Sequence, residues 1–124
     1  MKVKIIYVIS AFLILIVSGC SKPPKYNFES KEALMDSVLI QAGKEGIDLY
    51  TVAMVMSYPE INEMENKATA KLIEEKGRIP NNIQESITFT KEARKRCEPE
   101  QLKFYESKMR GKTLKQLIQE RGIE

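Results

Sequence analysis

Hydrophobic side chains recur at helical spacing through most of residues 30–124, with capping and stop residues between the runs. Ser30 precedes the first run, whose apolar positions stand mostly three or four residues apart up to Gly43 and Gly46. Serine is a good N-cap and glycine a good helix stop. The pattern therefore predicts a helix that begins after Ser30 and ends at one of the two glycines.

The next run, residues 49–57 (LYTVAMVMS), is apolar on all sides. A short run of this kind fits either a buried helix or a buried strand, and periodicity does not separate the two. Its Ala53, Met54 and Met56 favour the helix, and Asp48 is placed to cap it. We therefore predict a second helix here.

A third helix is predicted from Pro59 to Gly77, because proline suits the first turn of a helix and glycine suits its end. One stripe of this segment is apolar: Ile61, Met64, Ala68, Leu72 and Ile73. Residues 78–82 (RIPNN) are predicted as a loop, and the pattern of residues 83–89 is ambiguous.

The C-terminal third is predicted as short helices. Thr90 is placed to cap a helix over residues 91–97, which Glu98 and Pro99 would break because proline has no N–H to continue the hydrogen bonding. Pro99 can then open another helix. The sequence TLKQ at residues 113–116 fits a capping box that opens the last one.

The whole pattern predicts an all-α fold, a small bundle of four to six short helices over residues 30–124. Residues 20–29 (CSKPPKYNFE) are predicted to be a tether, because Pro23 and Pro24 favour an extended polyproline conformation. The chain is therefore predicted to have three parts: residues 1–19, a tether at residues 20–29 and one helical domain at residues 30–124.

Residues 1–19 differ from the rest of the chain. Lys2 and Lys4 precede the apolar run IIYVISAFLILIV at residues 5–17, and small residues follow it. A basic start, an apolar run and small residues before a cleavage site are typical of a secretory signal peptide. The run is shorter than the roughly 20 residues that a membrane span needs.

The end of this segment, Val17-Ser18-Gly19-Cys20, resembles the lipobox of bacterial lipoproteins, in which an aliphatic and two small residues precede a cysteine. The resemblance implies cleavage between Gly19 and Cys20. It also implies diacylglycerol on the Cys20 sulfur and a fatty acid such as palmitate on its new amino group. A cysteine suits this chemistry because its thiolate is a strong nucleophile. The alternative is an uncleaved amphiphilic helix with Cys20 as a buried thiol.

Ser21 follows this cysteine at the position where retention signals of enterobacterial lipoproteins carry aspartate. The resemblance therefore implies export to the outer membrane, with the domain facing the periplasm. The inner membrane and the cell surface are the alternatives.

A second resemblance concerns the two ends of the domain. The sequences ESKEAL at residues 29–34 with Ser37, and MRGKTL at residues 109–114 with Leu117 and Ile118, resemble an uncharacterised family of small proteobacterial lipoproteins. Members of that family have a capped first helix after the anchor and a Gly-Lys-Thr-containing helix at the end. This resemblance implies a helical architecture and no particular role.

Charge and composition exclude several classes of function. The chain carries 20 basic and 17 acidic residues, and removal of Lys2 and Lys4 leaves 18 basic against 17 acidic. A nearly neutral domain lacks the basic excess of nucleic-acid-binding proteins, so no nucleic-acid partner is expected. The absence of histidine excludes a Ser-His-Asp triad and histidine metal ligands. We expect no metal and no cofactor other than the lipid on Cys20.

Cys97 follows Arg94, Lys95 and Arg96, and neighbouring cations favour the thiolate form of a cysteine. A reactive or dimerising thiol is one interpretation, and a thiol packed on the inner face of a helix is the favoured one. The same three cations are a candidate surface for an acidic partner or for anionic lipid headgroups. The alternative is a solvated helix face.

These observations predict a membrane-anchored, non-enzymatic binding or adaptor protein for an envelope component, such as a secretion pilot, an exclusion factor or an immunity protein. The alternative is a module in which residues 49–56 line an apolar pocket for a lipid or peptide tail. An enzyme that uses Cys97 is the least favoured hypothesis. Five methionines are expected to fill the core rather than line a groove for a partner: Met35, Met54, Met56, Met64 and Met109.

Overall fold

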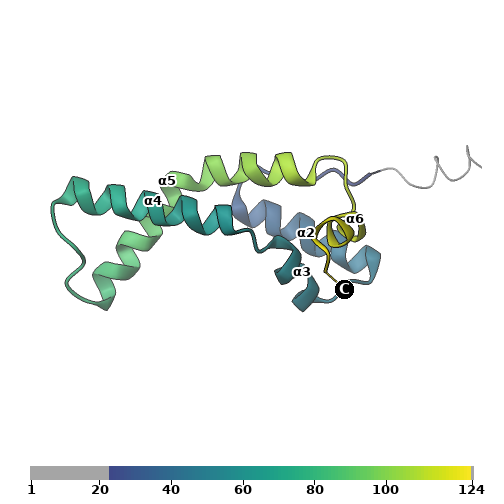
Figure 1. Cartoon of the computed structure of the whole chain (residues 1–124), viewed down its shortest axis with the longest axis horizontal. Helices are drawn as coiled ribbons and strands as arrows, with labels where there is room; N and C mark the ends of the chain where they lie inside the picture. The colour runs from purple at the N-terminus through teal and green to yellow at the C-terminus, as the bar shows by residue number, and fades with distance from the viewer. Residues whose placement is uncertain (1–22, 124) are drawn as a thin grey trace, which may run out of the picture.

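The computed structural model describes residues 23–123, and this part of the chain is helical, with no strand. Its five helices are α2 (Lys31–Glu45), α3 (Leu49–Met56), α4 (Pro59–Lys76), α5 (Ile83–Met109) and α6 (Leu114–Arg121) (Figure 1). The expected all-α fold is confirmed. None of these helices combines the length and the apolar character that a membrane crossing requires.

Three of the five helices, α2, α3 and α6, begin at the predicted caps. The Ser30 hydroxyl accepts a hydrogen bond from Ala33 N (3.1 Å), and the Asp48 carboxylate accepts one from Thr51 N (2.7 Å). The predicted capping box opens α6, with Thr113 as the N-cap. The apolar segment after Asp48 is therefore a helix rather than a strand.

Two of the predicted glycine stops are also confirmed. Gly46 and Gly77 follow α2 and α4 with a φ of 69° each, in the left-handed region that favours glycine. Gly43, the alternative stop for the first helix, lies inside α2.

Helix α5 differs from the sequence prediction. It is one helix of 27 residues that continues through Pro99, rather than two helices separated there. Its N-cap is Asn82, whose side chain accepts a hydrogen bond from Glu85 N (2.8 Å). Thr90, which we expected to be an N-cap, lies inside the helix and donates from its hydroxyl to Ser86 O (2.8 Å).

The proline bends α5 without ending it. Pro99 offers no N–H to the carbonyl of Lys95, and its ring crowds that carbonyl, so the helix axis turns at this point. Figure 1 shows the two parts of α5 running in different directions. Both parts contact α4, and this packing keeps the chain helical on both sides of the proline.

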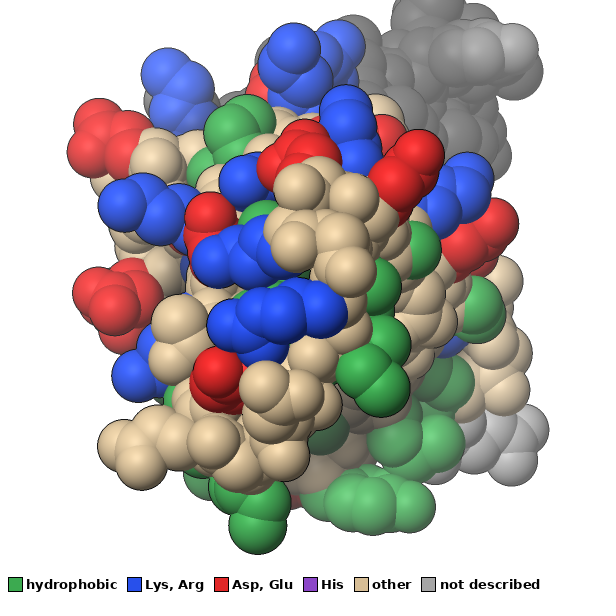
Figure 2. Space-filling model, turned by 90° about the vertical axis from the view of Figure 1, so that its left-hand side faces the viewer, with side chains coloured by type: hydrophobic (Ala, Val, Ile, Leu, Met, Phe, Trp, Pro, Cys, Tyr) green, Lys and Arg blue, Asp and Glu red, His purple; other side chains and the backbone are tan. Residues whose placement is uncertain are grey.

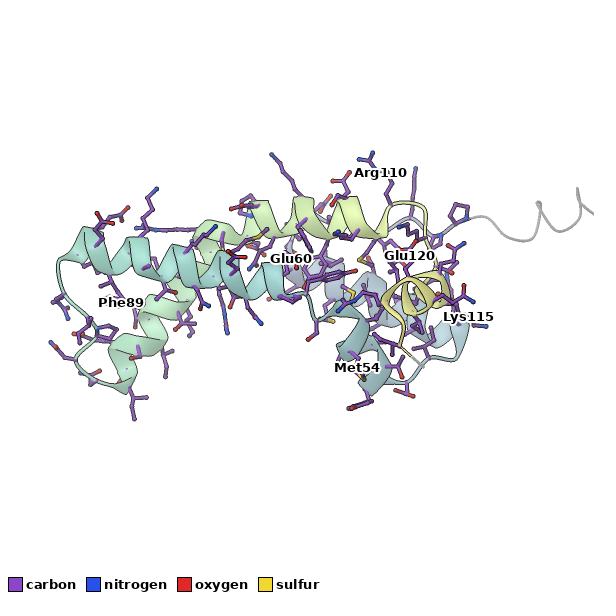
Figure 3. All side chains as sticks on the ribbon, viewed as in Figure 1. Met54, Glu60, Phe89, Arg110, Lys115 and Glu120 are labelled. Atoms are coloured by element: carbon purple, nitrogen blue, oxygen red, sulfur yellow. The ribbon has the colours of Figure 1, made fainter. Side chains whose placement is uncertain are left out.

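The molecule has two regions, and Figure 1 shows one projecting from the other. The body contains α2, α3 and α6 with the adjoining ends of α4 and α5. The arm contains the rest of α4 and α5 with the loop at residues 77–82. Its buried hydrophobic side chains are Leu72, Phe89, Ala93 and Cys97, and Figure 3 shows Phe89 between the two helices of the arm. One larger cluster forms the core of the body: Leu34, Val38, Ala42, Val52, Val55, Met56, Tyr58, Ile61, Tyr105, Met109, Leu114 and Leu117.

Acidic side chains of one helix cap the start of another. The Glu98 carboxylate accepts a hydrogen bond from Lys31 N (2.8 Å) at the start of α2. Glu45, the last residue of α2, accepts from Leu114 N and Lys115 N (3.0 Å each) at the start of α6. Negative charge is favourable at a helix N-terminus, so these contacts hold α2 against α5 and α6 against α2.

Arg121 caps the other end of a helix. Its guanidinium donates to Val55 O (2.6 Å) and to Ser57 O (2.7 Å), at the end of α3. Its central carbon also lies 4.1 Å from the centre of the Tyr58 ring. Positive charge suits a helix C-terminus, so α6 is attached to the connection between α3 and α4.

The N-terminal segment joins the body at Tyr26 and Phe28. The two rings are stacked 6.0 Å apart and pack against the hydrophobic cluster. The Tyr26 hydroxyl donates to Lys112 O (3.1 Å). Burial, with the negative charge of Glu45 adding to it, raises the pKa of Tyr26 to about 12. The chain is therefore held to the body from residue 26 onward.

Candidate functional site

The predicted lipidation residue Cys20, the cleavage site between Gly19 and Cys20, and the sorting residue Ser21 lie outside the described residues. The described chain starts at Pro23, three positions after Cys20, and is attached to the body at Tyr26. A short segment therefore separates the body from the predicted anchor. Any binding or catalysis by the described chain depends on the side chains of the body and the arm.

The side chains of the candidate surface, Arg94, Lys95 and Arg96, point in different directions, because successive residues of an α-helix are about 100° apart. Arg96 turns towards α4 and donates to the Glu75 carboxylate (2.6 Å). Arg94 Nε lies 3.6 Å from a carboxylate oxygen of Glu65. Lys95 is exposed and has no ion pair within residues 23–123. These cations therefore do not form one patch.

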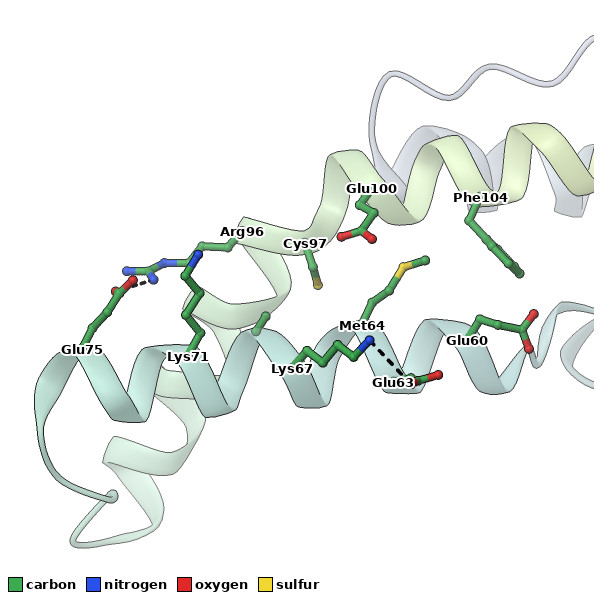
Figure 4. Close-up of a pocket in the computed structure, with 11 residues that line it drawn as sticks. Glu60, Glu63, Met64, Lys67, Lys71, Glu75, Arg96, Cys97, Glu100 and Phe104 are labelled. Atoms are coloured by element: carbon green, nitrogen blue, oxygen red, sulfur yellow. Dashed lines mark hydrogen bonds and ion pairs between the residues drawn. The ribbon is translucent and has the colours of Figure 1, made fainter.

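Cys97 is buried beside a groove between α4 and α5, as Figure 4 shows. Only 5% of the residue is exposed, and its thiol donates to Arg94 O (3.6 Å). Burial raises the pKa of the Cys97 thiol, and the negative charge of Glu65 raises it further. The favoured interpretation, a thiol packed on an inner helix face, is confirmed.

The groove beside Cys97 has a volume of about 500 Å³ and a mixed lining. It is apolar at Met64, Ala68, Cys97 and Phe104 and charged at Glu60, Glu63, Lys67, Lys71, Glu75, Arg96 and Glu100. Four of these seven charged side chains form two ion pairs: Lys67 lies 3.6 Å from Glu63, and Arg96 lies 2.6 Å from Glu75 (Figure 4). The lining carries four acidic and three basic side chains, so charges of both signs are mixed along the groove.

A polar cluster next to the bend of α5 joins the arm to the body. Glu65 accepts hydrogen bonds from Lys31 Nζ (3.3 Å) and Gln101 Nε2 (3.4 Å). Burial acts to raise the pKa of Glu65, but the hydrogen bond from Gln101 and the charges of Lys31 and Arg94 outweigh it and lower the pKa. Gln101 is completely buried, and its Nε2 also donates to Ile61 O (3.3 Å). The ionised Glu65 therefore links α2, α4 and α5.

The outer face of α3 corrects the expectation of a helix that is apolar and buried on all sides. Val52 and Val55 are buried, whereas Leu49 and Tyr50 are 70% and 75% exposed. None of the three hollows described for this molecule, two on the arm and one beside the N-terminal segment, is lined by α3. The alternative in which residues 49–56 line an apolar pocket therefore has no support from the geometry.

The methionines are likewise divided between the core and the surface. Met56 and Met109 are buried, Met64 is half-buried, and Met35 and Met54 are exposed. The prediction that methionines fill the core is therefore correct for Met56, Met64 and Met109. Met35 and Met54 instead lie on the apolar outer faces of α2 and α3.

The tip of the arm carries another exposed apolar face, at positions where the sequence pattern is ambiguous. Ile79, Ile83 and Ile87 are 68%, 80% and 50% exposed. A hollow of about 530 Å³ lies beside them, lined by Pro80, Asn81, Asn82, Ile83, Ser86, Ile87, Thr90, Lys91 and Arg94. Figure 2, viewed towards this end, shows hydrophobic side chains gathered in the lower part and charged ones in the upper part. The sequence signal for this face is the four-residue spacing of Ile83 and Ile87, which is out of phase with the inward-facing Phe89.

Within residues 23–123, no three or more side chains of His, Cys, Asp or Glu are grouped so that they could hold a metal ion. No family model, curated protein or solved structure matches the chain. Its functional interpretation therefore depends on its own residues and their geometry.

Proposed function

We propose that the chain is a lipid-anchored lipoprotein that binds another component of the bacterial envelope through its helical domain and catalyses no reaction. The observation that carries this proposal is the lipobox-like sequence VSGC at residues 17–20, placed directly before a short Pro-containing segment and a folded domain. Ser21 favours the outer membrane, with the domain facing the periplasm.

The length of the tether supports an arrangement in which the body is held close to the bilayer. Six residue steps separate Cys20 from Tyr26, which is bound to the body. A fully extended chain of six residues spans about 20 Å. Figure 1 places the start of the described chain at one end of the molecule and the tip of the arm at the other. An anchored body would therefore present the arm away from its attachment point.

The side chains that could carry chemistry favour binding over catalysis. Cys97 is buried with a raised pKa, which opposes a nucleophilic thiolate at neutral pH. Four of the charged side chains of the groove beside it form ion pairs, Glu63 with Lys67 and Glu75 with Arg96. Apolar faces on α2, on α3 and at the tip of the arm are exposed, and such faces are typical of interaction surfaces.

Metabolic labelling with an alkyne-tagged palmitate, in cells that express the full chain, tests the anchor. We expect the unmodified chain to be labelled and to fractionate with membranes. Cys20→Ser should lose the label and accumulate as the unprocessed precursor. Cys97→Ser is the matched control, since it removes the other cysteine, and it should be labelled like the parent. Labelling that survives Cys20→Ser would contradict the proposal.

A further inference from the structure

The outer face of α5 in the arm is apolar where a solvated helix face would be polar. Ile83 and Ile87 stand four positions apart and are mostly exposed, whereas Phe89 and Ala93 are buried in the arm. At about 100° per residue, Ile87 points nearly opposite to Phe89. The two isoleucines therefore face away from α4, and 80% of Ile83 and 50% of Ile87 are exposed.

The spacing along this face matches the seam of a helix that packs against another helix. Positions 83, 87, 90 and 94 follow one another at intervals of four, three and four, and all four line the hollow at the tip. Intervals of three and four are those of the a and d positions of a coiled coil. The seam is apolar at Ile83 and Ile87 and becomes polar at Thr90 and Arg94.

The charge of the same face is positive. Lys91 and Arg94 are the charged residues in the lining of the hollow, and no carboxylate lines it. Arg94 is 58% exposed and its Nε also lies 3.6 Å from Glu65, so Lys91 is the cation of this lining without an ion pair within residues 23–123. The nearby acidic residues are engaged elsewhere: Glu85 pairs with Arg78 (2.6 Å), and Glu92 pairs with Lys76 (3.6 Å). A ligand with aliphatic side chains and carboxylates is complementary to this surface.

We propose that this tip surface, formed by Ile83, Ile87, Lys91 and Arg94, binds an amphipathic helix of a partner protein in the envelope. Apolar side chains of the partner pack on Ile83 and Ile87, and carboxylates further along the same helix pair with Lys91 and Arg94. The location of the partner rests on the proposed function, whereas its chemistry follows from the arm alone.

Two features favour this surface over the exposed apolar faces of α2 and α3. The tip lies at the end of the molecule opposite the start of the described chain, which favours a partner beyond the bilayer over the bilayer itself (Figure 1). The exposed side chains of α3, Leu49 and Tyr50, line none of the three described hollows. They therefore lack the combination of an apolar hollow and neighbouring cations that the tip of the arm has.

A photo-crosslinking residue, p-benzoylphenylalanine, placed in the full chain in its native host tests the proposal. Positions 83 and 87 probe the tip surface, position 49 probes the α3 face, and position 103 probes an exposed site on the other part of α5. We expect crosslinks from 83 and 87, and peptide mapping should assign them to one amphipathic helical segment with carboxylates. Crosslinks to lipid, to a second copy of this chain or to a segment without carboxylates would overturn the proposal, as would a crosslink from position 49 alone.

Charge reversal makes the test specific. Lys91→Glu is expected to reduce the crosslink yield from position 87 about threefold, because an attractive contact becomes repulsive. Arg94 is left unchanged because it also pairs with Glu65 at the joint between arm and body. Lys103→Glu makes the same charge change on the other part of α5 and should leave the yield unchanged. Replacing the mapped carboxylates of the partner by lysine should restore binding to the reversed chain. An unchanged yield in the reversed chain, with α-helical circular dichroism retained, would overturn the proposal.

The two proposals fail in distinguishable ways. An acylated chain without crosslinks from positions 83 and 87 would refute the proposed tip surface and support the proposed anchor. A chain that forms the expected crosslinks but carries no lipid would refute the anchor and support the tip surface.

Discussion

The body of the molecule buries twelve hydrophobic side chains in one cluster, whereas the arm buries four: Leu72, Phe89, Ala93 and Cys97. Burial of apolar surface is the main favourable term in folding. The body therefore has the contacts expected of an independently stable core, and the arm depends on a much smaller one.

In addition to its small core, the arm has charged side chains that link α4 to α5. Arg96 contacts Glu75, and Lys76 lies 3.6 Å from Glu92 and 4.9 Å above the Phe89 ring. Ion pairs of this kind are exposed to water and to salt, so each contributes little to stability. The comparison indicates that the arm opens more easily than the body.

The same difference explains why the arm is the better candidate for a binding element. The body uses three helix ends for contacts with another helix: Glu98 caps the start of α2, Glu45 the start of α6 and Arg121 the end of α3. In contrast, the outer face of α5 in the arm leaves Ile83 and Ile87 in solvent. A partner helix on this face would add apolar contacts where the chain itself has few.

Leu117→Ala is expected to have the largest effect, because it removes a completely packed side chain from the core of the body. The loss in the free energy of unfolding should be about 2–5 kcal/mol, and the whole molecule should be affected. Thermal and urea unfolding monitored by circular dichroism measure it. Gln119→Ala, at an exposed position of the same helix, is the control and should have almost no effect. A loss confined to the arm would contradict the division into two regions.

Phe89→Ala should affect the arm alone. Truncation of a buried phenylalanine costs about 3–5 kcal/mol in a packed core, which is more than the remaining contacts of the arm are expected to supply. We expect amide hydrogens of residues 70–95 to lose their protection from exchange while those near Val38 and Leu114 keep theirs. Hydrogen exchange followed by mass spectrometry distinguishes the regions, with the exposed Thr88→Ala as control. Equal loss of protection in both regions would show that they unfold as one unit.

Acid is expected to loosen the joint between the regions through Glu65. Its pKa is lowered in the folded state, so the unfolded state takes up the proton first. The stabilisation is therefore present above the unfolded pKa of about 4.3 and is lost as the pH falls through the lower folded pKa. Glu65→Gln should flatten this acid dependence, and Glu32→Gln, on the exposed side of α2, is the matched control. A Glu65→Gln chain with the acid dependence of the parent would assign the effect to other groups.

Salt should give the smallest effect and should act mainly on the arm. Sodium chloride at 1 M reduces the screening length to about 3 Å, which weakens exposed ion pairs such as Arg96 with Glu75. We expect faster amide exchange in the arm and unchanged or slower exchange in the body. A larger effect of salt on the body would indicate that its charged helix caps carry more of the stability than its apolar cluster.

The sequence predicted the local features of the fold well, because their causes are local. The caps at Ser30, Asp48 and Thr113 depend on a backbone N–H three residues away, and each has the expected role. The capping carboxylates of Glu45 and Glu98 contact backbone groups 67 to 70 positions away in the chain. No short-range pattern contains such contacts.

The bend of α5 and the candidate site also depend on contacts between residues that are distant in sequence. Pro99 is compatible with a helix end or with a kink, and packing of both parts of α5 on α4 decides for the kink. The cations before Cys97 are adjacent in sequence but point in different directions, and Arg96 is engaged by Glu75 of another helix. The tip surface depends on Ile83 and Ile87 lying on an uncovered face, which only the arrangement of the helices determines.

The intact mass of the mature protein, purified in detergent from its native host, is the decisive measurement for the lipid anchor. We expect a chain that begins at Cys20 and carries a diacylglyceryl group, and the N-terminal proteolytic peptide should locate the lipid on this residue. A chain that retains residues 1–19, or that begins elsewhere without lipid on Cys20, would show that the protein is not a lipoprotein of this type.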